Sequence, residues 1–181
     1  MKDLVYIDEY GLLGSNFYWK KGAEKGLTQE ELIRVGVTDE RVQVSKDIIA
    51  ALVAADKEFQ EKGYKLYLKE GYRPKALYEL VYEARMKMSG DADRVFNMND
   101  MPHATGKSID VGLWDIKQDE QVHLRKNDDG TDALFVDFYR HRTDEEGKRY
   151  QELQDYLKDV MLKHGFEYGI KNEYFHFNYV K

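Results

Sequence analysis

Residues 103–114 read His-Ala-Thr-Gly-Lys-Ser-Ile-Asp-Val-Gly-Leu-Trp and combine a predicted strand with two candidate metal ligands. Alternation after Gly106 predicts a β-strand over 107–114, with three residues on its core face. These are Ile109, Val111 and Leu113. Asp110 then points the other way, into solvent or a cleft, and Gly106 permits a close backbone approach beside His103. Such a pair can bind a metal ion or form a structural hydrogen bond, and this stretch alone leaves both open.

A second strand is predicted at 64–70, where tyrosine and leucine alternate with other residues. It ends in Gly-Tyr-Arg-Pro at 71–74, and the proline can occupy the first turn of a helix over 75–88. Arg73 is thereby fixed at a strand end, where a planar cation can hold an oxyanion or a carboxylate. The alternative is a surface ion pair, the more common fate of an arginine.

Capping signals and apolar spacing predict the other helices. Residues 28–36 begin with a Thr-x-x-Glu capping box, and a second box opens the segment 143–165. Residues 38–63 begin with Thr-Asp-Glu and continue with apolar residues at helical spacing, so we expect one helix there. The aromatic residues of 166–180 indicate a strand, and the polar residues 89–102 indicate a long loop.

These elements predict an α+β fold, with helices packed on one face of a small, mostly antiparallel sheet. The 181 residues are 42% apolar, which is enough for a compact core. No repeat, low-complexity tract or linker interrupts the sequence. We therefore expect residues 1–181 to form a single domain.

Composition excludes several classes of partner. The net charge is -6 and no basic block is present, so we expect no nucleic-acid partner. No apolar run approaches the roughly 18 residues of a membrane span, and acidic residues break the N-terminal segment, so we expect a cytoplasmic protein without a membrane partner. Because cysteine is absent, a transition-metal site must be built from histidines and carboxylates. Oligomeric state has no signal in the sequence.

The end of the chain carries a further histidine motif, Glu173-Tyr-Phe-His176. In one continuous strand these two residues would point to opposite faces. Glu173 can share a site with His176 only if it lies at the strand entrance or on a bulge. The alternative is an edge strand with a solvated glutamate.

As a set, Gly-Tyr-Arg, His-x-x-Gly-x-x-Ile-Asp and Glu-x-x-His resemble the zinc D-alanyl-D-alanine peptidases. That group shares its metal-site fold with lysostaphin-like enzymes and the Hedgehog signalling domain. The resemblance is greatest to the D-alanyl-D-alanine dipeptidases of vancomycin-resistance clusters. Residues 62–76 are similar to their strand and arginine turn, and Asn16-Phe17 to their N-terminal Asn-Phe.

The resemblance implies one Zn²⁺ per chain, held by His103, Asp110 and His176. It implies that Glu173 is the general base and acid and that Arg73 stabilises the transition state. The implied reaction is hydrolysis of the small peptide D-alanyl-D-alanine by a metal-activated water.

A free dipeptide also needs an acid for its ammonium group, and Asp137 in Phe-Val-Asp-Phe is our candidate. Two features depart from the family pattern. Met101-Pro102 stands where a small hydroxyl residue usually precedes the first histidine, which puts the manner of substrate binding in doubt. Phe175 replaces a tryptophan and is conservative. The loop at 89–102 is expected to close over a short substrate.

Two alternatives remain at this stage. The first is a peptidoglycan D,D- or L,D-carboxypeptidase or a phage endolysin of the same fold, although no export signal or wall-binding module is evident. The second is a zinc-binding interaction domain without catalysis. The presence of both Glu173 and Arg73 argues against the second alternative.

Overall fold

The computed structural model describes residues 3–90, 92, 96, 98–169 and 171–181. Contacts divide the chain into two compact units, one of Met1–Asp47 with Leu68–Ile109 and one of Ile48–Tyr67 with Asp110–Lys181. The division passes through two strands of the chain. The predicted single domain stays a prediction.

The described chain contains a two-stranded and a six-stranded sheet. The first pairs β1 with β3, and the second has the order β2-β4-β5-β8-β7, with β6 paired to β5. The strands are β1 (Leu4–Tyr6), β2 (Leu13–Gly14), β3 (Gln43–Ser45), β4 (Tyr64–Glu70), β5 (Ser108–Asp115), β6 (Glu120–Gln121), β7 (Phe166–Tyr168) and β8 (His176–Tyr179). The pairs β1–β3, β5–β6 and β7–β8 are antiparallel. The predicted α+β class with a mostly antiparallel sheet is confirmed.

Two central strands agree closely with their predicted ranges. β4 covers the predicted residues, and β5 is displaced by one residue from its prediction. The predicted core face of β5 is fully buried, while Asp110 is half-buried. Alternation identified these strands because burial of one face imposes a two-residue period.

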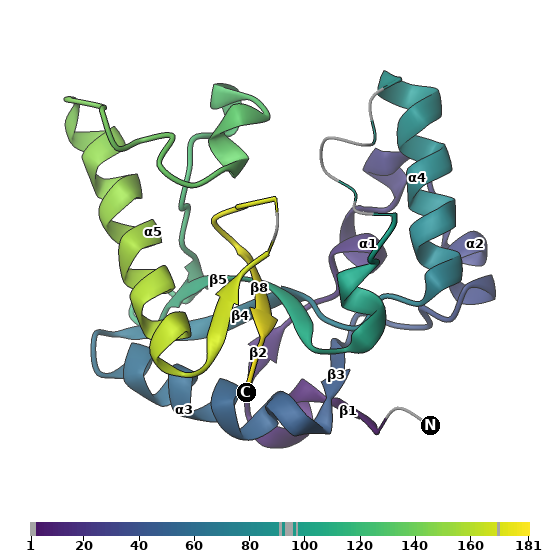
Figure 1. Ribbon diagram of the computed structural model, residues 1–181, viewed down its shortest axis with the longest axis horizontal. Coiled ribbons are helices and arrows are strands. Elements are labelled where there is room, and N and C mark those ends of the chain that lie inside the picture. The colour runs from purple at the N-terminus through teal and green to yellow at the C-terminus, as the bar shows by residue number, and fades with distance from the viewer. Residues whose placement is uncertain (1–2, 91, 93–95, 97, 170) are drawn as a thin grey trace. The chain divides into compact units, whose positions relative to one another are not determined.

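Three helices of the first unit share a small core (Figure 1). They are α1 (Phe17–Lys21), α2 (Gln29–Arg34) and α4 (Lys75–Ser89). The buried residues are Tyr18, Leu27, Leu32, Val37, Leu77 and Val81. The predicted capping box of α2 is present, because Thr28 and Glu31 each accept a hydrogen bond from the other's backbone N–H. Pro74 precedes α4 as its N-cap residue.

The helix predicted from Thr38 onward is wrong in its first part. Residues Gln43–Ser45 form β3, and helix α3 covers only Ile49–Gln60. The Asp39 carboxylate accepts a hydrogen bond from the Arg41 backbone N–H at 2.9 Å, which makes a tight turn. Antiparallel pairing with β1 then takes the backbone hydrogen bonds that a helix would have used.

In the second unit, α3 packs with α5 (Glu145–Lys163), and rings from the two helices meet edge to face at 5.4 Å. The cap of α5 is Asp144 rather than the predicted Thr143, because its carboxylate accepts the Gly147 N–H at 2.8 Å. The predicted single strand at 166–180 is also wrong. That segment contains β7 and β8 as an antiparallel hairpin. None of the helices in the described ranges has the length and hydropathy needed to cross a membrane.

Asp56 provides a test of the packing between α3 and β4. Its buried carboxylate accepts the backbone N–H of Leu66 at 2.8 Å and the Gln60 amide at 2.6 Å. Replacing Asp56 by alanine leaves the buried Leu66 N–H without its acceptor, so we expect a loss of about 1–3 kcal/mol in the free energy of unfolding. Urea denaturation measures the change.

Asp56→Asn is the matched control, because asparagine keeps an acceptor oxygen for the Leu66 N–H. We expect this variant to unfold between the alanine variant and the unmodified chain. Equal midpoints for the alanine variant and the unmodified chain would show that the Asp56–Leu66 bond adds nothing to stability.

Candidate metal centre

A short 3-10 helix, Pro102–Thr105, delivers His103 to the start of β5. It ends at Gly106, whose φ of 77° is in the left-handed region. The Gly106 carbonyl accepts the Ser45 N–H at 2.8 Å, and a Cβ at Gly106 would lie 2.9 Å from a methyl carbon of Leu4. The predicted close backbone approach at Gly106 is therefore confirmed.

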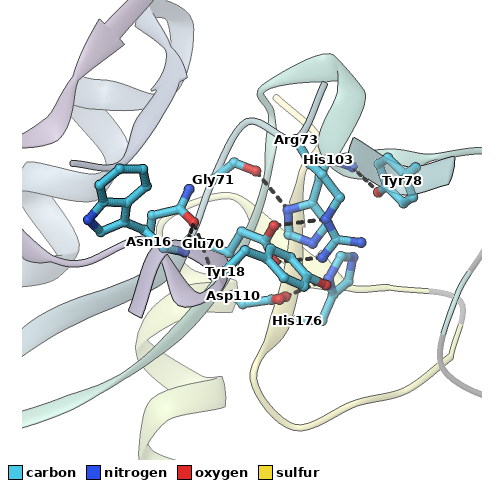
Figure 2. A network of polar contacts seen from close by, with 10 residues as sticks. Asn16, Tyr18, Glu70, Gly71, Arg73, Tyr78, His103, Asp110 and His176 are labelled. Atoms are coloured by element: carbon cyan, nitrogen blue, oxygen red, sulfur yellow. Dashed lines mark hydrogen bonds and ion pairs between the residues drawn. The ribbon is translucent and has the colours of Figure 1, made fainter. Parts of the chain in front are cut away.

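Two hydrogen bonds hold His103 in place, one through its backbone and one through its ring (Figure 2). Its backbone N–H donates to the Tyr78 hydroxyl at 2.9 Å, and its Nδ1 lies 2.8 Å from the Gly71 carbonyl oxygen. Because a carbonyl can only accept, Nδ1 carries the proton in this contact. The lone pair is then on Nε2, so the ring is oriented and in the correct tautomer to bind a metal ion.

Arg73 is connected to His103 through the backbone. Its N–H donates to the His103 carbonyl oxygen at 3.2 Å. Its guanidinium is buried and forms a bidentate ion pair with Glu70, with Nε–Oε1 at 2.8 Å and Nη2–Oε2 at 2.5 Å. The surface ion pair considered from the sequence is therefore absent, because this pair is buried.

Asp110 and His176 face each other from β5 and the start of β8. Asp110 Oδ1 lies 2.8 Å from His176 Nδ1, and both side chains are largely enclosed. The Val111 N–H donates to the Phe175 carbonyl at 2.9 Å beside them. Gly169 packs against the ring of His176, where any Cβ would overlap the ring atom Cδ2. A glycine at this hairpin position is the only sequence signal for this contact, and sequence reasoning missed it.

Glu173 lies outside β8, at the strand entrance that a shared site requires. It forms an isolated antiparallel bridge with Phe135, flanked by backbone bonds from Tyr174 to Leu134 and from Val136 to Asn172. A turn separates this bridge from β8, and the His176 N–H donates to the Glu173 carbonyl at 3.2 Å. The Glu173 side chain is buried.

Three of these side chains form a group that could hold a metal ion. His103, Asp110 and His176 each offer one ligand atom, and these atoms lie within 4.8 Å of one another. Two imidazoles and one carboxylate fit a zinc site with three protein ligands and an open fourth position. The oriented Nε2 of His103 supports this fit, because its hydrogen-bonded Nδ1 supplies the outer contact typical of a metal-bound histidine.

Asp137, the candidate ammonium anchor, already has a cationic partner. It has a left-handed φ of 64°, and its exposed carboxylate accepts two hydrogen bonds from Arg140, the one from Nε at 2.7 Å. Arg140 also pairs with Asp155 at 3.0 Å. The role of Asp137 in substrate binding stays a prediction.

Met101-Pro102, the departure from the family pattern, builds the turn before His103. Met101 has a left-handed φ of 43°, and its carbonyl accepts the Ala104 N–H at 2.8 Å. Pro102, with its restricted φ, begins the 3-10 helix. The predicted closing loop at 89–102 falls partly on residues that lie outside the described ranges.

Comparison with known proteins shows likeness in fold. No protein-family model matches the sequence, and no curated protein matches it. Among solved structures, the LdcB LD-carboxypeptidase matches with a TM-score of 0.50 and 17% identity over 76% of this chain. This chain spans 59% of that structure's length. A zinc-bound mutant of the vancomycin-resistance D,D-pentapeptidase VanY, from a VanB-type cassette, matches at a TM-score of 0.47 and 17% identity, over 77% of this chain and 74% of that chain.

The LD-carboxypeptidase match assigns a fold and nothing finer, because its identity to this chain is low. The chain has the α+β fold of that peptidase, in line with the fold class predicted from the helices and strands of the sequence.

Metal content tests the candidate ligands directly. We expect about one equivalent of zinc per chain after reconstitution and dialysis, because three candidate ligands converge. His103→Ala and His176→Ala should each retain less than about half an equivalent, because loss of one ligand leaves only two. Elemental analysis gives the ratio.

His141→Ala is the matched control, because that histidine is exposed and outside the group. It should bind zinc like the unmodified chain. Full zinc content in both ligand variants would remove these histidines from the metal site.

Proposed function

We propose that this chain is a zinc-dependent peptidase. The observation that carries the proposal is the group of His103, Asp110 and His176, whose ligand atoms lie within 4.8 Å of one another. Three protein ligands leave a position for water or substrate, which is typical of a catalytic zinc site and not of a structural one. The zinc-bound interaction domain without catalysis is less favoured, because buried Glu173 and Arg73 accompany the ligands.

Zinc, when bound, supplies Lewis acidity toward water and a substrate carbonyl. Glu173 takes the proton of the attacking water at a carboxylate oxygen and passes it to the leaving amine. Two contacts hold the Glu173 backbone in place for this role. One is the bridge to Phe135, and the other is the hydrogen bond that the Glu173 carbonyl accepts from the His176 N–H. Burial of Glu173 keeps competing water away from the carboxylate.

Arg73 donates hydrogen bonds to the oxyanion as negative charge develops on the substrate. The backbone bond from Arg73 to His103 ties this donor to a metal ligand. Glu70 occupies one edge of the guanidinium through Nε and Nη2. The Nη1 end of the fork, with its two N–H groups, is the part that serves the oxyanion.

For the substrate, we propose free D-alanyl-D-alanine. The resemblance of residues 62–76 and of the three motifs to the D-alanyl-D-alanine dipeptidases supports this choice. In this proposal Asp137 leaves Arg140 and binds the ammonium group of the dipeptide. Action in the cytoplasm stays a prediction.

The second candidate is a carboxypeptidase acting on peptidoglycan stem peptides. Two observations favour it: one solved structure with a matching fold is an LD-carboxypeptidase, and Asp137 is already paired with Arg140. An enzyme that cleaves longer peptides needs no acid for a free ammonium group next to the scissile bond.

Glu173→Gln tests the catalytic proposal. Glutamine keeps the shape of the side chain but cannot accept the proton, so we expect zinc content to persist and kcat to fall by roughly 10²–10⁴-fold. Glu167→Gln, on the exposed face of β7, is the matched control and should retain full activity. Near-normal turnover by a zinc-loaded Glu173→Gln protein would assign the base to another group.

Substrate length separates the two candidate functions. We expect kcat/KM for D-alanyl-D-alanine to exceed that for its N-acylated form, and for a stem tripeptide with the same terminus, by at least about tenfold. Both of these substrates lack a charged ammonium group on the residue whose carbonyl is cleaved, and one favourable contact of about 1.4 kcal/mol corresponds to tenfold. If the blocked or longer substrates are cleaved as well or better, the carboxypeptidase is the correct function.

A further inference from the structure

The Arg73 guanidinium is surrounded by groups of the kinds that bind a planar cation. Its central carbon lies 4.4 Å from the ring centre of Tyr78, 5.1 Å from that of Tyr18 and 5.6 Å from that of Phe96. Glu70 pairs with one edge of the same group (Figure 2). Aromatic faces and a carboxylate both attract a planar cation.

Glu70 makes this burial energetically possible. A buried charge is costly unless it is paired and hydrogen-bonded, and Arg73 and Glu70 are only 6% and 2% exposed. Burial alone would lower the pKa of Arg73, but the charge of Glu70 and its hydrogen bonds raise the pKa well above the usual value. The arginine is therefore held as a cation, and its partner is a carboxylate with no other role in the proposed chemistry.

The three aromatic residues around the guanidinium are held by contacts that do not involve the Arg73 side chain. Tyr18 lies in the first turn of α1, and its backbone N–H donates to Oδ1 of the N-cap residue Asn16 at 3.0 Å. Its side chain packs in the core shared with α2 and α4. The Tyr78 hydroxyl accepts the His103 N–H at 2.9 Å. Phe96 packs against the same core. Removal of the Arg73 side chain should therefore leave an anionic site lined by aromatic rings.

We propose that Glu70, Tyr18, Tyr78 and Phe96 form a preformed guanidinium-binding site that positions Arg73 for catalysis. The binding site stands by itself, and its catalytic consequence rests on the proposed peptidase function. Glu70 is a positioning residue: it acts through the orientation of Arg73. The site prefers a guanidinium to an ammonium ion, because two parallel N–H groups of a guanidinium match the two carboxylate oxygens of Glu70. An ammonium ion has no such pair of parallel donors.

The test uses Arg73→Ala and the free guanidinium ion at millimolar concentrations, far below those that denature proteins. Thermal unfolding is followed with and without zinc. We expect guanidinium to raise the melting temperature of the variant saturably, by about 3–6 °C at roughly ten times its dissociation constant. Methylammonium at equal ionic strength should have no such effect, and the unmodified chain should respond to neither ion.

Arg73→Ala/Glu70→Gln is the matched control, because it keeps the rings but removes the carboxylate. Saturable stabilisation should disappear in this double variant. An equal rise in both variants, or none in Arg73→Ala, would overturn the proposal. If Arg73→Ala folds only when guanidinium is present, the proposal is supported, and failure to fold with or without the ion would show that no preformed site exists.

Measurement of kcat tests the positioning role separately from the binding site. A missing oxyanion donor costs roughly 10²–10³-fold in kcat, and we expect guanidinium to restore at least about a tenth of the lost kcat in zinc-loaded Arg73→Ala. A rise in melting temperature without rescue of an otherwise active enzyme would overturn the positioning role and leave the binding site. If the unmodified chain has no peptidase activity, the proposed function fails, while the melting data still decide the binding site.

Discussion

The candidate site depends on the close approach of residues 70–73, at the end of β4, to two other backbone segments. Gly71 makes this possible, because any Cβ there would overlap the carbonyl oxygen of Gln43. The Tyr72 N–H donates to that same carbonyl at 2.6 Å, and the next N–H donates to the carbonyl of His103 at 3.2 Å. Within four residues the chain thus binds β3, orients a candidate metal ligand and buries an ion pair. A side chain at Gly71 would displace all three.

Backbone pairing also sets the direction of the Glu173 and His176 side chains. The bridge between Phe135 and Glu173 stops before β8 begins, and the turn between them changes which side chains face the site. A regular strand would have separated Glu173 from His176 by its two-residue alternation. Gly169 then fills the space beside the imidazole with bare backbone. The regular strands therefore hold the backbone, and the turn between the bridge and β8 places the polar side chains.

Sequence predicted the elements whose periods are imposed by burial on one face, such as β4 and β5. It failed where a local signal competes with a distant partner: Thr38 reads as a helix cap, yet the residues after it pair with β1. The three proposed metal ligands followed from the resemblance of their motifs to a zinc peptidase family, and the structure brings them together. Glu70 and Gly169 were missed, because an acid at a strand end and a glycine in a hairpin have many common structural uses. Their significance depends on Arg73 and His176, which are in contact with them only after folding.

The Glu70–Arg73 pair also changes the electrostatic account of the proposed reaction. Alone, Arg73 would add a positive charge to the site, but its bidentate pairing makes the two residues neutral as a unit. In the proposed reaction, Arg73 therefore contributes N–H donors of fixed direction rather than net positive charge. Asp110 and Glu173 carry two negative charges, which balance those of a bound divalent ion. In the proposed step, Glu173 takes a proton and loses its negative charge as the substrate gains one. The proposed step therefore keeps the net charge of the site constant, without an ion from solvent.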